Sequence, residues 1–210
     1  MTAATAETAG TLPGREFPLG ATVTATGTNF AVASGVADGM QLCLFDEAGA
    51  ETTIAIRDRD AGVWHVFVPG VGAGQAYGYR ATGPYDPARG VRCHPAKLLL
   101  DPYARAVSGT VTFGPEVLGY SGSDQDIPNE VDSAPFVPRS LVVADELYPW
   151  RDGACRGYSY ADTILYEVHV KGFTMRHPGV PAGLRGTYSG LGHEAAIAHL
   201  LDLGVTAVEL

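Results

Sequence analysis

The sequence predicts an all-β immunoglobulin-like sandwich followed by the first βαβ unit of an α/β fold. Between residues 21 and 82, short segments alternate apolar and polar side chains with period two and are separated by Gly, Asp and Asn. Prolines then crowd residues 84–149. After Asp162 a β-branched run, a helical pattern and a second apolar run follow one another. The chain therefore changes fold class once, after a proline-rich stretch.

The first part predicts six short strands. In the third, Leu42 and Leu44 share one face while Cys43 and Phe45 share the other, and residues 46–49 supply a turn. Strands spaced by about 8–12 residues are typical of an antiparallel sandwich. The expected strands are 21–25, 29–34, 40–46, 51–57, 63–68 and 76–81.

The proline-rich stretch predicts little regular structure, because proline fixes φ and removes a backbone donor. A long segment of this kind usually packs against a neighbour or serves function. We expect a frayed tail over 1–14, the sandwich over 15–108, an irregular interdomain connector over 109–161 and the α/β part over 162–210.

The α/β part predicts a strand over 164–170, a long Gly- and Pro-containing loop, a helix over 193–203 and a strand over 205–210. Gly204 stands where a C′ glycine stops a helix. Strand, helix and strand in this order predict a parallel pair with a right-handed crossover. The last strand is almost wholly apolar and is expected to be buried on both faces. The apolar helix face comprises Ala196, Ile197, Leu200 and Leu201.

Composition excludes several classes of partner. The net charge of −9 argues against a nucleic-acid groove or an anionic membrane surface, since both recruit clustered Lys and Arg. Cys43, Cys93 and Cys155 are widely spaced, which fits neither a disulfide framework nor a zinc site. His94 beside Cys93 does not complete a metal site, so no metal or cofactor is expected. Residues 1–10 have no signal-peptide pattern, and the cytoplasm is the expected compartment.

Several long stretches of the sequence are characteristic of one enzyme family: FPLGATVTATGTNFAVAS, YGYRATGPYDPARG, KLLLDPYARAV, DSAPFVPRS, DTILYEVHVKGFTMRHPGVPAGLRGTYSGL and DLGVTAVEL. They resemble the bacterial glycogen debranching enzymes of isoamylase type, within the α-amylase superfamily. The similarity runs from about Arg15 to Leu210. It implies that a glucan-associated β-sandwich module precedes the first two strands of a (β/α)8 barrel, which is incomplete here because such a barrel takes about 250 residues. Where the family commonly shows GxRFNPNKLLLDPYA, this chain has Cys93, His94 and Ala96.

The resemblance implies hydrolysis of α-1,6 branch linkages in glycogen or limit dextrin, as part of glycogen catabolism. Retaining glycosidases use two carboxylates about 5–5.5 Å apart, and in this superfamily they lie on later barrel strands. We therefore name no catalytic residue and expect residues 1–210 alone to be inactive. The implied partners are an α-glucan and the remainder of the barrel. The alternative is a non-catalytic glucan-binding or structural module, or a truncated relic.

Four side chains near the first barrel strand are candidates for substrate contact: His169, Lys171, Arg185 and Tyr188. The loops that follow barrel strands gather at the active-site face, where a Tyr can stack on a sugar and an Arg can donate to hydroxyls. The alternative is a packing role for each. Glu167 and His169 share a strand face and could form an acid/base pair. For Glu167 and Glu209 we nevertheless favour a structural, hydrogen-bonded role over a catalytic one.

Three aromatic residues of the sandwich are candidates for a glucan platform: Trp64, Tyr77 and Tyr79. A flat ring covers the apolar face of a pyranose. Core or interdomain packing is the alternative, and for Trp64 it is favoured by the flanking Val63 and Val66.

Overall fold

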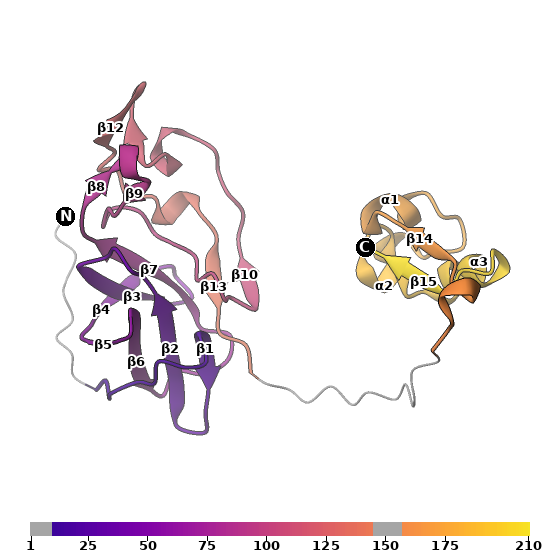
Figure 1. Ribbon diagram of the computed structural model, residues 1–210, viewed down its shortest axis with the longest axis horizontal. Helices are drawn as coiled ribbons and strands as arrows, with labels where there is room; N and C mark the ends of the chain where they lie inside the picture. The colour runs from indigo at the N-terminus through magenta and orange to yellow at the C-terminus, as the bar shows by residue number, and fades with distance from the viewer. Residues whose placement is uncertain (1–9, 145–156) are drawn as a thin grey trace. The chain divides into compact units, whose positions relative to one another are not determined.

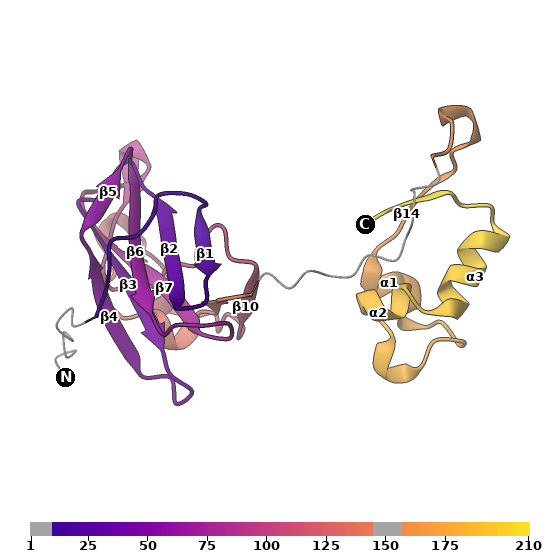
Figure 2. The same ribbon diagram turned by 90° about the horizontal axis from the view of Figure 1, so that it is seen from below.

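A computed structural model describes residues 10–144 and 157–210. The chain divides into two compact units, Met1–Leu147 and Tyr148–Leu210, which are drawn in Figures 1 and 2. Each unit is described by itself. No helix in the described ranges is long and apolar enough to cross a membrane.

The first unit contains two larger antiparallel sheets. One has the strand order β1-β2-β6-β5, and the other has the order β10-β13-β7-β3-β4 (Figure 1). Their bounds are β1 Gly20–Val23, β2 Gly27–Ala33, β3 Gly39–Phe45, β4 Glu51–Ile56, β5 Asp58–Asp60, β6 Val63–Pro69, β7 Ala76–Thr82, β10 Ala106–Ser108 and β13 Arg139–Leu141. The antiparallel all-β part is confirmed, with all six expected strands present.

The two sheets bury one face each against a shared core. In β2 and β6, Phe30 and Val66 are register partners that both point inward. From the other sheet, Leu42 and Tyr77 are fully buried. Because side chains alternate across a strand, the residues between them point to the outer faces. The buried core comprises Phe30, Val32, Ala37, Met40, Leu42, Ile56, Trp64, Val66, Val68, Tyr77, Tyr79, Ala81 and Val142.

The segment expected to be an irregular connector, 109–161, is not irregular throughout. Strand β13 lies within it and pairs with β7 at Ser140↔Tyr77, so it belongs to the five-stranded sheet. β10 extends that sheet. The prediction missed β13 because three residues between Pro138 and a loop are too few to show an alternating pattern. The short elements of residues 85–136 are β8 Tyr85–Asp86, η1 Pro87–Arg89, β9 Val91–Arg92, η2 Pro115–Val117, β11 Tyr120–Ser121, β12 Asp124–Pro128 and η3 Ala134–Phe136.

Arg80, in β7, connects the proline-rich segment to the five-stranded sheet through hydrogen bonds and ion pairs. Its Nε and Nη2 donate to the two carboxylate oxygens of Glu51 at 2.7 and 2.6 Å, and Nη2 also donates to Asp132 at 2.9 Å. Nη1 donates to the carbonyl of Pro95 at 2.9 Å. Burial acts to raise the pKa of Glu51, but the hydrogen bonds from Arg80 outweigh it and leave that pKa below its ordinary value. A bidentate, charge-assisted pair of this kind fixes both position and orientation.

Lys97 holds two parts of the proline-rich segment together by hydrogen bonds to their backbone carbonyls. It is only 9% exposed, and its Nζ donates to the carbonyls of Glu116 and Val131 at 2.9 and 2.7 Å. Burial lowers the pKa of Lys97 because it disfavours the charged ammonium. Hydrogen bonds from side chains thus replace the regular backbone pairing that proline prevents here.

The second unit contains a parallel strand pair, β14 Leu165–Glu167 and β15 Ala207–Glu209, in the register Leu165↔Ala207 and Glu167↔Glu209. Helix α3, Glu194–Asp202, lies between them in the sequence. Gly204 has φ of +74°, and its N–H donates to the Leu201 carbonyl, as a C′ glycine does. The parallel order and the helix are confirmed; that the pair begins a barrel stays a prediction.

Two expectations for this unit are wrong. The strand predicted to reach residue 170 stops at Glu167, because His169 caps a helix, α1 Val170–Met175, by accepting a hydrogen bond from Gly172 N–H. The stretch expected to be a loop also contains η5 Ala182–Leu184 and α2 Tyr188–Leu191, while η4 Tyr160–Asp162 precedes β14.

Burial in the second unit is incomplete. Only Ala196 and Leu200 of the expected helix face are buried; Ile197 is 43% and Leu201 68% exposed. The last strand, expected to be buried on both faces, has Val208 39% exposed. These apolar side chains are therefore left partly exposed by the described residues of their own unit.

Candidate functional site

The three aromatic residues proposed as a glucan platform lie in the core of the first unit. Trp64, Tyr77 and Tyr79 are 7%, 0% and 1% exposed. Tyr77 packs edge-on against Phe30 and Tyr79, with ring centroids 5.0 and 6.0 Å apart. A ring with no exposed face cannot stack on a sugar, so the platform prediction is wrong and the alternative of core packing holds.

A buried polar network explains why Tyr77 is a tyrosine. Its hydroxyl donates to Asp101 Oδ2 at 2.8 Å, and the N–H of Asp101 donates to Ser140 Oγ at 3.0 Å. Burial raises the pKa of Asp101, although hydrogen bonds from Tyr103 N–H and Tyr77 oppose that rise. This network joins β7, β13 and the loop between them, so its role is structural.

The four predicted barrel-side residues are only partly brought together. An open hollow of about 580 Å³ in the second unit is lined by His169, Lys171 and Tyr188, together with Glu167. The ring of Tyr188 is 73% exposed. The full lining is Glu167, Val168, His169, Val170, Lys171, Gly186, Thr187, Tyr188 and Leu210.

Arg185 is not part of that hollow. Its Nε donates to the Val180 carbonyl at 2.8 Å and its Nη2 approaches the Pro178 carbonyl at 3.5 Å. The guanidinium therefore holds its own loop, which is the structural alternative for this residue.

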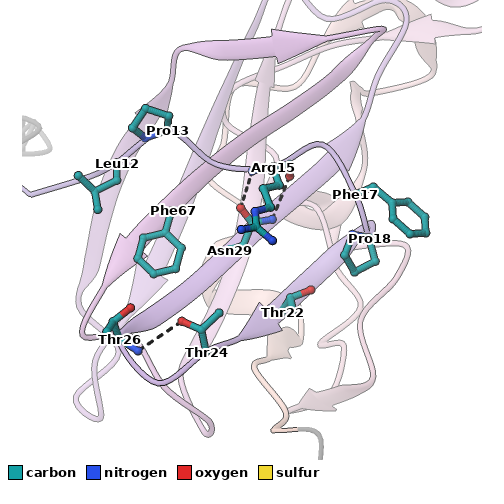
Figure 3. A pocket seen from close by; sticks show the side chains of 10 residues that line it. All are labelled: Leu12, Pro13, Arg15, Phe17, Pro18, Thr22, Thr24, Thr26, Asn29 and Phe67. Atoms are coloured by element: carbon teal, nitrogen blue, oxygen red, sulfur yellow. Dashed lines mark hydrogen bonds between the residues drawn. The ribbon is translucent and has the colours of Figure 1, made fainter.

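The sequence prediction missed a groove on the outer face of the β1-β2-β6-β5 sheet (Figure 3). Its volume is about 400 Å³. Thr22, Asn29 and Phe67 are successive register partners across β1, β2 and β6, and form its floor. The lining residues are Leu12, Pro13, Arg15, Phe17, Pro18, Thr22, Thr24, Thr26, Asn29 and Phe67.

The N-terminal segment 12–18 forms the wall of the groove. Leu12 pairs with Phe67 through two backbone hydrogen bonds of 2.9 and 3.0 Å. Asn29 then holds the backbone of Arg15, accepting from its N–H at 2.7 Å and donating to its carbonyl at 3.0 Å. Between them Gly14 crosses close to the sheet: a Cβ there would lie 2.6 Å from the Val66 nitrogen. Only a glycine allows this approach, so the wall is built into the fold.

The segment 12–18 falls partly in the tail that was expected over 1–14, so residues 12–14 of that tail are ordered against the sheet. The available signal was weak, because Leu12 and Phe17 are isolated apolar residues in a stretch with no period.

The described ranges contain no group of three or more His, Cys, Asp or Glu side chains that could hold a metal ion. Cys43 is buried, and burial is the main cause that raises its pKa. Cys93 is half-buried, and the Nδ1 of His94 accepts from Ala96 N–H at 3.1 Å. Cys155 lies outside the described residues. Among the described residues, the groove and the hollow are therefore candidate sites for a ligand other than a metal ion.

Comparison with known proteins gives two kinds of likeness. Residues 18–104 match the family model of carbohydrate-binding module 48, the isoamylase N-terminal domain. The chain is 45% identical over 201 residues to a protein named glycogen operon protein GlgX homolog from Mycobacterium tuberculosis H37Rv, covering 94% of this chain and 28% of that protein. It is 46% identical over 197 residues to a glycogen debranching enzyme of Cronobacter sakazakii, covering 94% and 29%.

Among solved structures, a type I pullulanase of Bacillus subtilis complexed with maltose superposes with a TM-score of 0.62 at 22% identity, over 92% of this chain and 24% of that one. A pullulanase of Anoxybacillus complexed with maltotetraose gives 0.60 at 23% identity, over 90% and 24%. These structures show likeness of fold. The chain spans less than a third of the length of the curated relatives it matches.

Proposed function

We propose, from its homology to glycogen debranching enzymes over 94% of its residues, that this chain is the N-terminal part of such an enzyme. The enzyme would hydrolyse α-1,6-glucosidic branch linkages in glycogen or limit dextrin, within glycogen catabolism. The observation that supports this most is the identity of about 45% with those relatives through both units of the chain. The module match over 18–104 supports association with an α-glucan.

Catalysis by such an enzyme needs an acid/base and a nucleophile. Glycoside hydrolysis with retention uses two carboxyls about 5–5.5 Å apart that face one sugar. Glu167 and Glu209, which are register partners in β14 and β15, occupy the first two strands of the proposed barrel. We keep for them the structural role expected from the sequence and place the catalytic pair outside residues 1–210.

The hollow beside β14 would then lie on the substrate side of the proposed barrel, because it follows the C-terminal ends of β14 and β15. His169, Lys171 and Tyr188 stay candidates for substrate contact there. Arg185 is a weaker one, since its guanidinium is engaged by backbone carbonyls. The cytoplasm stays the proposed compartment.

The test assays two proteins in parallel for reducing ends released from branched limit dextrin: residues 1–210, and the product of the complete reading frame. We expect the complete product to release reducing ends and the 210-residue chain to release none. Linear amylose is the control substrate, on which an α-1,6-specific enzyme gives no product. Debranching by residues 1–210 alone would overturn the placement of the catalytic pair. An inactive complete product that is retarded in a glycogen-loaded gel would favour a non-catalytic glucan-binding module.

A further inference from the structure

We infer that the groove on the outer face of the β1-β2-β6-β5 sheet binds a linear α-glucan segment. This inference rests on the proposed association with α-glucans, and it assigns that association to the outer face of the sheet whose inner face carries the buried Trp64. Figure 3 shows the ten side chains arranged around the groove, from the loop at Thr24 and Thr26 to Phe17 and Pro18.

The groove offers apolar surface of the shape that a pyranose needs. The ring of Phe17 is 76% exposed and lies beside Pro18 at one end of the groove (Figure 3). The half-buried ring of Phe67 lies in the floor, bounded by Leu12 and Thr26 (Figure 3). Exposed aromatic rings flanked by polar groups are typical of ligand sites, because a flat ring packs against an apolar face while polar neighbours bind hydroxyls.

The polar groups of the groove are available to a ligand. The hydroxyls of Thr22 and Thr26 make no hydrogen bond to other described residues, and neither does the Arg15 guanidinium. Asn29, in contrast, uses its side-chain oxygen and nitrogen to fix the Arg15 backbone. The groove thus combines a fixed frame with unused donors and acceptors, which lowers the ordering cost of binding.

The lining disfavours a cationic ligand and offers hydrogen-bonding groups that suit hydroxyls. Arg15 is the only charged residue among the ten that line the groove. No carboxylate is present in this set to pair with a cationic ligand, and one guanidinium with three threonines suits sugar hydroxyls. The volume of about 400 Å³ lies within the range of about 300–1,000 Å³ found for small-molecule sites. A short run of glucose units meets each of these conditions.

The test measures maltotetraose binding to the full 210-residue chain by calorimetry and by amide chemical shifts. We expect shifts at Thr22, Thr26 and Phe67. Phe17→Ala should weaken binding about five- to tenfold, because it removes a stacking ring. Phe113→Ala is the matched control: Phe113 is 89% exposed in the same unit and lies outside the groove. Its affinity should equal that of the parent chain.

Because Phe17 is exposed, Phe17→Ala should leave the thermal transition unchanged, and a matching melt excludes misfolding as the cause of lost binding. Equal affinities for the two variants, or shifts confined to other surfaces, would overturn the inference. So would absence of maltotetraose binding by the parent chain, which would leave the groove to a protein partner. Debranching by the complete product is a separate measurement. Glucan binding at the groove can therefore be disproved while the proposed function holds, and the proposed function can be disproved while glucan binding at the groove holds.

Discussion

Both units contain strands or helices with an apolar face, but they differ in how much of that apolar surface is buried. In the first unit, Phe30, Leu42 and Tyr77 are fully buried because two sheets oppose their apolar faces. In the second, Leu165, Leu201 and Leu210 are 59%, 68% and 65% exposed around a single strand pair. The difference teaches that an alternating or amphipathic pattern stabilises a fold only when a second layer covers it.

The strongest test of this contrast is amide exchange of the intact chain. We expect amides of β2 and β6 to exchange about a thousandfold more slowly than those of β14 and β15, a difference of about 4 kcal/mol in opening free energy. Strands β2 and β6 each have two paired neighbours, whereas β14 and β15 have only each other within the described ranges. Uniform protection of both units in a monodisperse monomer would contradict it.

Shortening an apolar side chain should also affect the stability of the two units very differently. Phe30→Ala should lower the free energy of unfolding of the first unit by about 4 kcal/mol, because it leaves a cavity under Tyr77 and Val66. Leu201→Ala in α3 should change the stability of the second unit by less than about 0.5 kcal/mol, since Leu201 is 68% exposed. Urea unfolding followed by tryptophan fluorescence and by helical circular dichroism measures both. Equal losses would show that Leu201 is covered in solution.

Loss of the Arg80 ion pairs should have the next largest effect on the stability of the first unit. Arg80→Ala should cost about 3 kcal/mol, because it leaves Glu51 partly buried without its cation and releases Asp132 and the Pro95 carbonyl. Arg15→Ala, which removes the same side chain at an exposed position of the same unit, is the matched control. Similar urea midpoints for the two variants would show that the ion pairs of Arg80 do not stabilise the first unit.

The same pair predicts a pH dependence. The pKa of Glu51 is lower in the folded chain than its ordinary value of 4.5, so its contribution to stability is present above pH 4.5 and is lost as pH falls through the folded pKa. Asp101 acts in the opposite sense: its pKa is raised from 3.8, so its contribution is present below that pH and is lost as pH rises through the folded pKa. Glu51→Gln should therefore flatten the loss of stability between neutral pH and about pH 3. An unchanged acid slope in urea midpoints would exclude Glu51 as its source.

The smallest predicted effect concerns the helix stop in the second unit. Gly204→Ala should destabilise that unit by about 1 kcal/mol, because an alanine at φ of +74° is strained. Gly183→Ala is the matched control, since a Cβ there meets no neighbour within 4 Å and the residue is not in the left-handed region. Exchange rates of the α3 amides report the difference. Equal rates in the two variants would show that the left-handed stop contributes nothing.

Local pattern predicted much of the fold because its causes are local. The six sandwich strands, helix α3 and the Gly204 stop each follow from alternation, helical period or backbone freedom within about ten residues. The candidate sites were predicted less well. Tyr77 and Tyr79 were correctly placed on one strand face, but alternation does not say which face is the core. His169 was placed on a strand, yet its ring nitrogen accepts a helix-capping bond that alternation cannot reveal.

By itself the sequence determined the antiparallel and parallel order of the two units and the likeness to debranching enzymes, because repeated patterns and long similar stretches are written residue by residue. Tertiary structure alone decided that Tyr77 faces inward, that Arg80 joins residues 29 and 52 positions away, and that segment 12–18 closes a groove over Asn29. These outcomes depend on which surfaces meet when distant strands pack, and a contact between distant residues leaves no period in the chain.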